Sequence, residues 1–473
     1  MTASNAPAAP PGAPPATGGL RRTMTHRHLV MIALGGVIGS GLFVSSGYTI
    51  AQAGPLGAVL AYLIGALVAY MVMSSLGELA AKDPAVGGFH AHATRNLGPA
   101  WGFATAWLYW MCWAVALGSE FTAAGILMQR WFPGVPVWVW CLLFAGALFT
   151  MNAISARVFA ESEFWFSLIK VAAVLAVIVI GGATILGINP AAQGGPVGLG
   201  GFMTADGLLP TGIAGVLVTI LAVFYAFSGT ELIGVAAGEA QDPERTIPAA
   251  IRTAVIRLAV FFVGAIAVIA AIIPYEQAGT DESPFVTVLD RAGLPLGADA
   301  MNFVIITALL SAGNSGLFSC ARMLHSLGVE GQAPRWLSRT TRRGIPLIAL
   351  CLSMVGGLAS LLSSVVAPGS LFLALVSIAG FAVVAVWIAI AASHLGFRRR
   401  YLRDGGDLAD LPYRAPLFPL LPILALILLG ASLLGVGLDP AQRAALWFGV
   451  PFTLACLGWF RWRHGAGVFA PQR

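Results

Sequence analysis

Apolar segments about as long as a lipid bilayer is thick recur along almost the whole chain. A helix needs about 20 apolar residues to cross roughly 30 Å of hydrocarbon, and twelve such segments follow one another. They begin near residues 28, 56, 101, 137, 162, 211, 252, 299, 347, 369, 416 and 444. The pattern predicts an all-α integral membrane protein with twelve transmembrane helices.

Little of the chain is left for a soluble domain. The chain is 58% hydrophobic and 10% charged, outside the range of soluble proteins, and its longest connections cover residues 187–210, 274–298 and 325–346. No GxxxxGK[ST] phosphate loop occurs, which excludes ATP-driven transport within this chain. We expect a disordered cytoplasmic tail over 1–20, a membrane domain over 21–465 and a second cytoplasmic tail over 466–473.

The basic residues predict the orientation of the segments. If both termini are cytoplasmic, 22 of the 26 lysines and arginines lie on the cytoplasmic side, Lys170 lies within a segment, and three lie outside: Arg130, Arg291 and Arg443. By the positive-inside rule, this predicts a multi-pass protein of the cytoplasmic (inner) cell membrane. Topology explains the net charge of +6, and no nucleic-acid partner is expected.

The sequence suggests neither catalytic residues nor a metal site. The five cysteines lie within predicted spans at unrelated spacings, and His90 and His92 stand in a glycine-rich loop without a clustered cysteine or acid. We therefore expect solvated cytoplasmic histidines, no metal, no cofactor and no enzyme activity.

Two spans carry small, polar interruptions. The first contains GGVIGSGLF (residues 35–43) and the sixth contains FSGTE (residues 227–231). Close helix packing through Gly35 and Gly39 is one interpretation. However, an inverted five-plus-five repeat (about 28–187 and 211–395, with helices 11 and 12 at about 416–462) would pair these two spans. Discontinuous helices in corresponding positions mark the binding site of secondary transporters.

The broken segments predict the substrate ligands. Backbone N–H groups of Gly39, Ser40 and Gly41 suit an α-carboxylate, and carbonyl groups of the sixth-span break suit an α-ammonium. The predicted substrate-binding set from the two breaks is Ile38, Gly39, Ser40, Gly41, Phe227, Ser228, Gly229, Thr230 and Glu231.

Charged groups inside the membrane are costly and therefore functional candidates. Lys170 lies about 12 Å into the fifth span at 1.5 Å per residue, and we predict that Lys170 and Glu231 couple ion movement to transport; snorkelling of Lys170 to the surface is the alternative. Glu120 and Glu239 are predicted to gate the site or attract a cation. Alternatively, Glu120 bonds a neighbouring helix and Glu239 is an ordinary interfacial acid.

Two uncharged residues complete the predicted site. Trp113 on the third span offers a π-face to a cation, although mid-span aromatics also serve packing. Asn314 on the eighth span supplies polar atoms, which could equally join helices.

Five stretches of the sequence carry a resemblance to a known family: GGVIGSGLF, WLYWMCWAVALGSEFTAAG, EFWFSLIKV, AFSGTELIGVAAGEAQDPERTIPAAIR and SAGNSGLFSCARMLHSLG. Together they resemble the amino acid transporter family of the amino acid, polyamine and organocation (APC) superfamily. The resemblance implies the leucine-transporter fold and proton-coupled uptake of an amino acid, with the proton gradient as energy source. It places the α-carboxylate on residues 39–41, the α-ammonium on residues 227–230, and Lys170 where sodium-coupled relatives hold a sodium ion.

The resemblance also bears on the substrate. The second half, with LPYRAPLFPLLP and GLDPAQRAALWFGVPF, is most similar to S-methylmethionine permeases, and lysine permeases share the GTELIGVAAGE run. S-methylmethionine is the predicted substrate; lysine, another basic amino acid or a neutral one is the alternative. An amino acid sensor that does not transport has the same site features, whereas a channel would not need paired broken helices.

Overall fold

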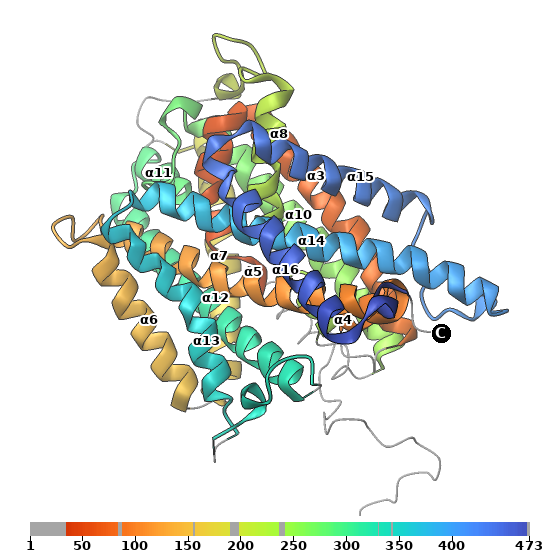
Figure 1. Cartoon of the computed structure of the whole chain (residues 1–473). Helices are drawn as coiled ribbons and strands as arrows, with labels where there is room; N and C mark the ends of the chain where they lie inside the picture. Colours follow the sequence, from red (N-terminus) through yellow and green to blue (C-terminus); the bar gives the residue numbers. More distant parts are fainter. Residues whose placement is uncertain are drawn as a thin grey trace, which may run out of the picture.

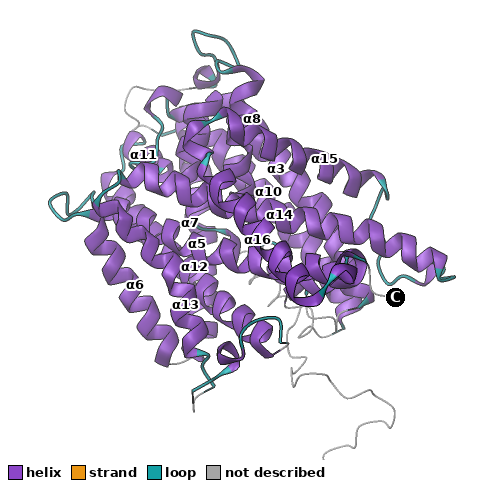
Figure 2. Cartoon of the chain, in the orientation of Figure 1, coloured by secondary structure: helices purple, strands orange, loops and turns teal. Residues whose placement is uncertain are grey.

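The computed structural model describes residues 35–83, 88–154, 157–189, 198–235, 242–329, 331–341 and 344–470. Apart from one isolated bridge between Thr204 and Gly207, the regular structure of these residues is helical, as Figure 2 shows. The long helices pack side by side in one body (Figure 1).

The elements follow one another with short connections. The long helices are α3 (Ser45–Lys82), α5 (Pro99–Met128), α6 (Val137–Ile154), α7 (Arg157–Ile185), α8 (Gly212–Ala226), α10 (Pro243–Ile272), α12 (Pro295–Val329), α13 (Leu347–Leu358), α14 (Pro368–Arg403), α15 (Leu420–Gly435) and α16 (Ala444–His464). Shorter α-helices are α2 (Ser40–Phe43), α4 (Phe89–Leu97), α9 (Leu232–Val235) and α11 (Pro284–Arg291). Single 3-10 turns are η2 (Gly200–Phe202), η4 (Tyr275–Gln277), η5 (Arg335–Ser338), η6 (Ala359–Ser364), η7 (Leu408–Asp410), η8 (Val436–Leu438), η9 (Pro440–Gln442) and η10 (Ala466–Phe469).

The helices confirm the predicted all-α membrane architecture. Among the described residues, 8 helices are long and apolar enough to cross a bilayer, and three shorter apolar helices cover Val137–Ala153, Gly212–Ala226 and Leu420–Gly435. The second half of the first span and the whole second span are joined in α3, which kinks at Gly54 (φ 72°) before Pro55. Residues 28–34 of the first span lie outside the described residues. The boundaries of the two tails and the two repeats stay predictions.

Helix α5 is the most deeply buried of the long helices. In its most apolar stretch 89% of residues are buried, against 22% in the corresponding stretch that contains α16. Helix α5 packs against α14, α12 and α13, so any site on it lies inside the bundle. By contrast, α16 exposes Trp447 and Leu454, as expected of a helix that faces lipid.

The expectation that His90 and His92 are solvated was wrong. Both lie on α4 and are buried, with 8% and 4% of their surface exposed, because α4 packs against α5 and α14. Phe89 anchors the helix through a ring contact with Tyr109, 4.8 Å between centroids. Burial lowers the pKa of His90 to about 4 and that of His92 to about 3. No group of residues able to hold a metal ion occurs in the described part of the chain.

Helix α11 covers the end of the molecule that the arginine distribution assigns to the outside. The hydroxyl of Ser283 donates to the carbonyl oxygen of Phe43 at 2.6 Å. The rings of Phe43 and Phe285 meet edge to face, with centroids 5.0 Å apart. The first break is therefore closed on this side by a direct contact with α11.

At the opposite end, a buried ion pair joins α3 to α14. The guanidinium of Arg398 binds both carboxylate oxygens of Glu78, with Nη2 2.7 Å from Oε2. The backbone N–H of Ala415 donates to the same oxygen at 2.7 Å, and the ring of Phe418 lies 4.7 Å from the Arg398 guanidinium carbon. This cluster ties the segment after α14 to α3.

Candidate functional site

The predicted break in the first span is present. Residues 35–37 are helical, Ile38 and Gly39 form a bend, and α2 begins at Ser40. Gly39 precedes α2, and its backbone is non-helical (φ −145°, ψ −152°). Gly39 itself supplies no side chain to cap the N-terminus of α2. The N–H of Ser40 therefore has no partner within its own helix and is available to a carboxylate.

The predicted break in the sixth span is also present. Helix α8 ends at Ala226, and residues 227–231 form turns before α9 begins at Leu232. Gly229 has φ 96°, a left-handed conformation that a residue with a Cβ rarely adopts. The hydroxyl of Thr230 donates to the carbonyl oxygen of Phe227 at 3.1 Å. The glycine thus fixes where the span can unwind.

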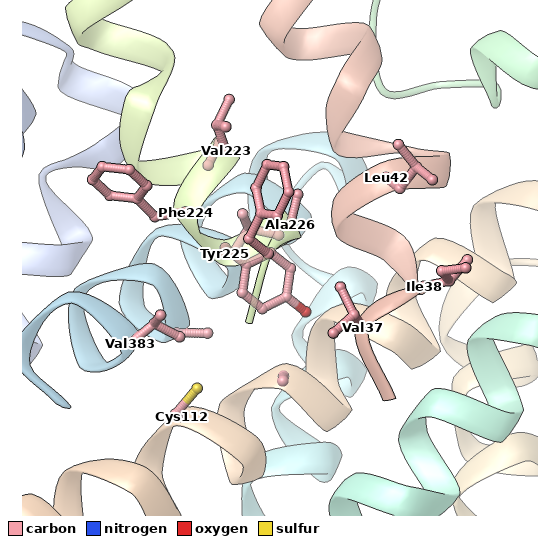
Figure 3. Close-up of a cluster of buried hydrophobic side chains, with 14 of the residues drawn as sticks. Val37, Ile38, Leu42, Cys112, Val223, Phe224, Tyr225, Ala226 and Val383 are labelled. Atoms are coloured by element: carbon pink, nitrogen blue, oxygen red, sulfur yellow. The ribbon is translucent and has the colours of Figure 1, made fainter. Parts of the chain in front are cut away.

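The two breaks lie directly against each other. A Cβ atom built on Gly41 would stand 2.6 Å from the Cα of Ala226, so only glycine permits this approach. Figure 3 shows Tyr225, near the end of α8, close to Val37 of the first break, and both line the same cavity. The ligands predicted from two distant parts of the sequence are therefore brought together.

Glu120 occupies the place predicted for the substrate carboxylate. The N–H of Ser40 lies 3.2 Å from each of its carboxylate oxygens, and the Ser40 hydroxyl donates to Oε1 at 2.9 Å. Glu120 is 6% exposed and reaches the break from α5. A protein carboxylate thus binds the donors that the sequence predicts for the carboxylate of an amino acid.

Tyr225 is a site residue that the sequence did not reveal. Its hydroxyl lies 3.3 Å from the Ser40 hydroxyl, 2.8 Å from that of Ser119 and 3.5 Å from Glu120 Oε1. Its position two residues before the sixth-span break was the only available signal. Tyr225 links the sixth span to the carboxylate-binding donors of the first.

A small cavity lies where the breaks meet α5. Its volume is about 10 Å³, room for about one water molecule. Of the predicted ligands, Gly39, Gly41, Trp113 and Ser228 line it, together with Glu120. Cys112 and Tyr225, which were not predicted, also line it. As the described residues enclose it, this cavity is too small for an amino acid.

Lys170 reaches the first break from α7. Its ammonium group donates to the carbonyl oxygen of Gly35 at 2.7 Å, and its side chain is fully buried. The alternative of a lysine that snorkels to the surface is therefore wrong, because the group is in the interior. Its predicted role in ion coupling remains a prediction.

Glu231 lies behind the sixth-span break. It is 1% exposed, and its Oε1 accepts the backbone N–H of Gly229 at 3.0 Å. Its Oε2 accepts the indole N–H of Trp387 at 3.3 Å. Trp387 on α14 is a second residue that the sequence did not single out, because it stands within an ordinary apolar span.

Other predicted site residues face elsewhere or cannot be placed. Asn314 does not line the cavity, and its side-chain oxygen accepts from the Asn152 amide at 2.6 Å. The ring of Phe227 packs against that of Phe262, with centroids 4.9 Å apart. Ile38 is fully buried, and Glu239 lies outside the described residues. Substrate contacts of these residues stay predictions.

Comparisons with known proteins identify the family of the chain. Residues 28–463 match the model of the amino acid permease family. The amino-acid permease RocC of Bacillus subtilis is 50% identical over 442 residues, covering 93% of this chain and 94% of that protein. A putative histidine permease of Bacillus subtilis is 50% identical over 440 residues, 92% of each chain. The lysine-specific permease LysP of Escherichia coli is 42% identical over 461 residues, 94% of each chain. The chain belongs to the amino acid permease family, whose members are transporters and not enzymes.

Proposed function

We propose that this permease takes up a basic amino acid together with protons across the inner cell membrane, with both termini in the cytoplasm. Relatives described as lysine-specific and as a putative histidine permease favour the basic substrate. S-methylmethionine, predicted from the second half of the sequence, carries one fixed positive charge as lysine does, and it remains a competitor to be tested.

The observation that carries this proposal is the position of Glu120 on the donors of Ser40. An arriving α-carboxylate needs the same N–H and hydroxyl groups. Two carboxylates cannot share one buried set of donors without strong repulsion. Substrate binding therefore requires Glu120 to leave these donors, and uptake of a proton by Glu120 removes the repulsion.

This exchange gives protons a place in the transport cycle. Glu120 holds the donors as an anion when no substrate is present and releases them when it is protonated. Lys170, bonded to Gly35 at the same break, keeps a positive charge near either carboxylate. We propose Lys170 and Glu231 as ion-coupling residues, as predicted from the sequence, and add Glu120 to them.

Glu231 is the proposed partner of the substrate's side-chain charge. It is a buried carboxylate close to the break, and a cation placed near the bilayer midplane needs an anionic or aromatic partner. The indole of Trp113 on the cavity wall offers the aromatic one. Lysine and protonated histidine both supply the required charge.

The direct test is uptake into proteoliposomes with an imposed inward proton gradient. Radiolabelled lysine and histidine are offered separately, with S-methylmethionine, arginine and methionine as competitors. We expect accumulation of a basic amino acid that collapses when a protonophore is added. Stronger inhibition of the labelled uptake by methionine than by arginine would refute the basic substrate, and binding without accumulation would indicate the sensor alternative.

Glu120→Gln tests the coupling step. The amide cannot take up and release a proton, so we expect exchange of labelled for unlabelled substrate to continue while gradient-driven accumulation is lost. Glu276→Gln, at an exposed position of η4, is the matched control and should accumulate normally. Full gradient-driven accumulation by Glu120→Gln would rule out the proposed role.

A further inference from the structure

Trp387 has the largest fully buried side chain of the described residues, and its only polar atom points at Glu231. The indole N–H donates to Oε2 at 3.3 Å. An indole can donate one hydrogen bond and accept none through this nitrogen. The single hydrogen bond that the Trp387 side chain can donate therefore goes to one carboxylate oxygen of Glu231.

Within the described part of the chain, only neutral donors hold the carboxylate of Glu231. Its two oxygens are held by Gly229 N–H and Trp387 N–H. None of the ion pairs found in the described part of the chain includes Glu231. A buried carboxylate is costly unless it is paired. Hydrogen bonds alone hold this one, so its negative charge is left for an incoming positive group.

The two donors stand on elements of different rigidity. Gly229 belongs to the broken segment, whereas Trp387 belongs to α14, which runs unbroken over 36 residues. Val383, one turn earlier on α14, points toward the end of α8 in Figure 3, and the Trp387 ring lies 5.9 Å from that of Phe224. Trp387 thus holds Oε2 of Glu231 from a continuous helix, α14, and not from the broken segment itself.

The Glu231 carboxylate does not line the cavity itself, but it lies beside the part of the break that does. Its Oε1 accepts from the N–H of Gly229, and the preceding residue, Ser228, lines the cavity. We propose that Trp387 is a positioning residue that orients the Glu231 carboxylate toward the positively charged end of the substrate side chain. This inference rests on the proposed uptake of a basic amino acid.

The test compares lysine with norleucine, which has the same carbon chain but no terminal ammonium. Trp387→Phe should raise the KM for lysine about tenfold, as expected when a charged hydrogen bond is lost. Inhibition of uptake by norleucine should stay unchanged, because norleucine does not use the carboxylate. Trp107→Phe is the matched control, since the Trp107 indole N–H is buried and has no hydrogen-bond partner among the described residues, and the KM of this variant should not change.

Two further variants separate positioning from packing. Replacing Trp387 with 3-benzothienylalanine removes only the N–H and preserves the ring shape, so it should reproduce the change in KM even if Trp387→Phe folds poorly. In a Glu231→Gln background, Trp387→Phe should have no further effect on lysine uptake, because the negative charge that Trp387 orients is gone.

The outcomes are distinguishable. Equal weakening of lysine and norleucine, or additive effects in the double variant, would overturn the positioning role. The same holds if the benzothienyl isostere behaves like the parent protein. If the parent protein itself does not take up lysine or histidine, the proposed function fails, and this inference fails with it.

Discussion

Arg398 on α14 holds both carboxylate oxygens of Glu78 on α3, and both side chains are almost completely shielded from solvent, with 6% and 0% exposed. His394 adds a third group, with Nε2 3.2 Å from Oε1 of Glu78. A buried pair of this kind need not stabilise a protein more than apolar residues would, but removing one partner leaves an uncompensated charge.

Arg398→Ala should therefore lower the free energy of unfolding by about 3–5 kcal/mol. The apparent melting temperature in detergent, followed by size-exclusion chromatography of heated samples, measures the loss. Arg399→Ala removes the exposed neighbouring arginine and should melt like the parent protein. Equal melting of the two variants would contradict a structural role of the pair.

Lys170→Ala should strongly slow gradient-driven uptake. The alanine removes the charged donor to the Gly35 carbonyl group, a bond of the class that contributes about 1.5–3 kcal/mol, so the rate should fall roughly 10- to 100-fold. Initial uptake rates in proteoliposomes measure the change. The other lysine of the chain provides the control, because Lys82 is exposed and Lys82→Ala should transport normally. Full concentrative uptake by Lys170→Ala would exclude its coupling role.

Arg130→Ala should weaken the packing of α11 against the first break. Arg130 binds Asp290 of α11 at 2.9 Å, Glu282 at 2.8 Å and Asp299 of α12 at 2.6 Å. Because these groups are partly exposed, we expect a loss of only about 1 kcal/mol, which makes opening about fivefold more frequent.

The opening can be measured by labelling Ser283→Cys with a membrane-impermeant maleimide added from outside, after the exposed Cys351 is replaced by serine. Labelling should be faster in the Arg130→Ala background, and Arg291→Ala is the control because Arg291 bonds Ile272 and Gln277 instead. No labelling from outside in either background would contradict the predicted orientation.

The buried histidines of α4 predict lower stability in acid. Because their folded-state pKa values, about 4 and about 3, lie below the unfolded value of about 6.5, the unfolded chain binds more protons below that pH. Stability is thus complete above about pH 7 and decreases between pH 6.5 and 4, by about 2 kcal/mol per histidine at pH 5.

Melting temperatures at pH 7.5, 6 and 5 test this expectation. His92→Gln should flatten the pH dependence, whereas His325→Gln, at a partly exposed position, should not. If His92→Gln melts with the same pH dependence as the parent protein, the buried imidazole is not responsible.

The sequence predicted both breaks because small, polar interruptions stand in two spans that an inverted repeat would pair. It also predicted that Lys170 belongs to the interior, since its distance from the span end exceeds the reach of a lysine side chain. These features are local and can be read from spacing alone.

The partner of each charged group depended on tertiary packing. Glu120 meets Ser40 across 80 residues of sequence, and Trp387 meets Glu231 across 156, so no local pattern indicates either contact. The histidines of α4 were misjudged for a related reason. A short helix with two histidines looks hydrophilic, and its burial depends on α5 and α14.

The cavity of about 10 Å³ has a consequence for the energy balance of the cell. A file of water molecules across a bilayer would need many such spaces in a row, and this one holds about one. Under the proposed proton-coupled mechanism, so small a space limits the passage of water-borne protons through the break and so preserves the gradient.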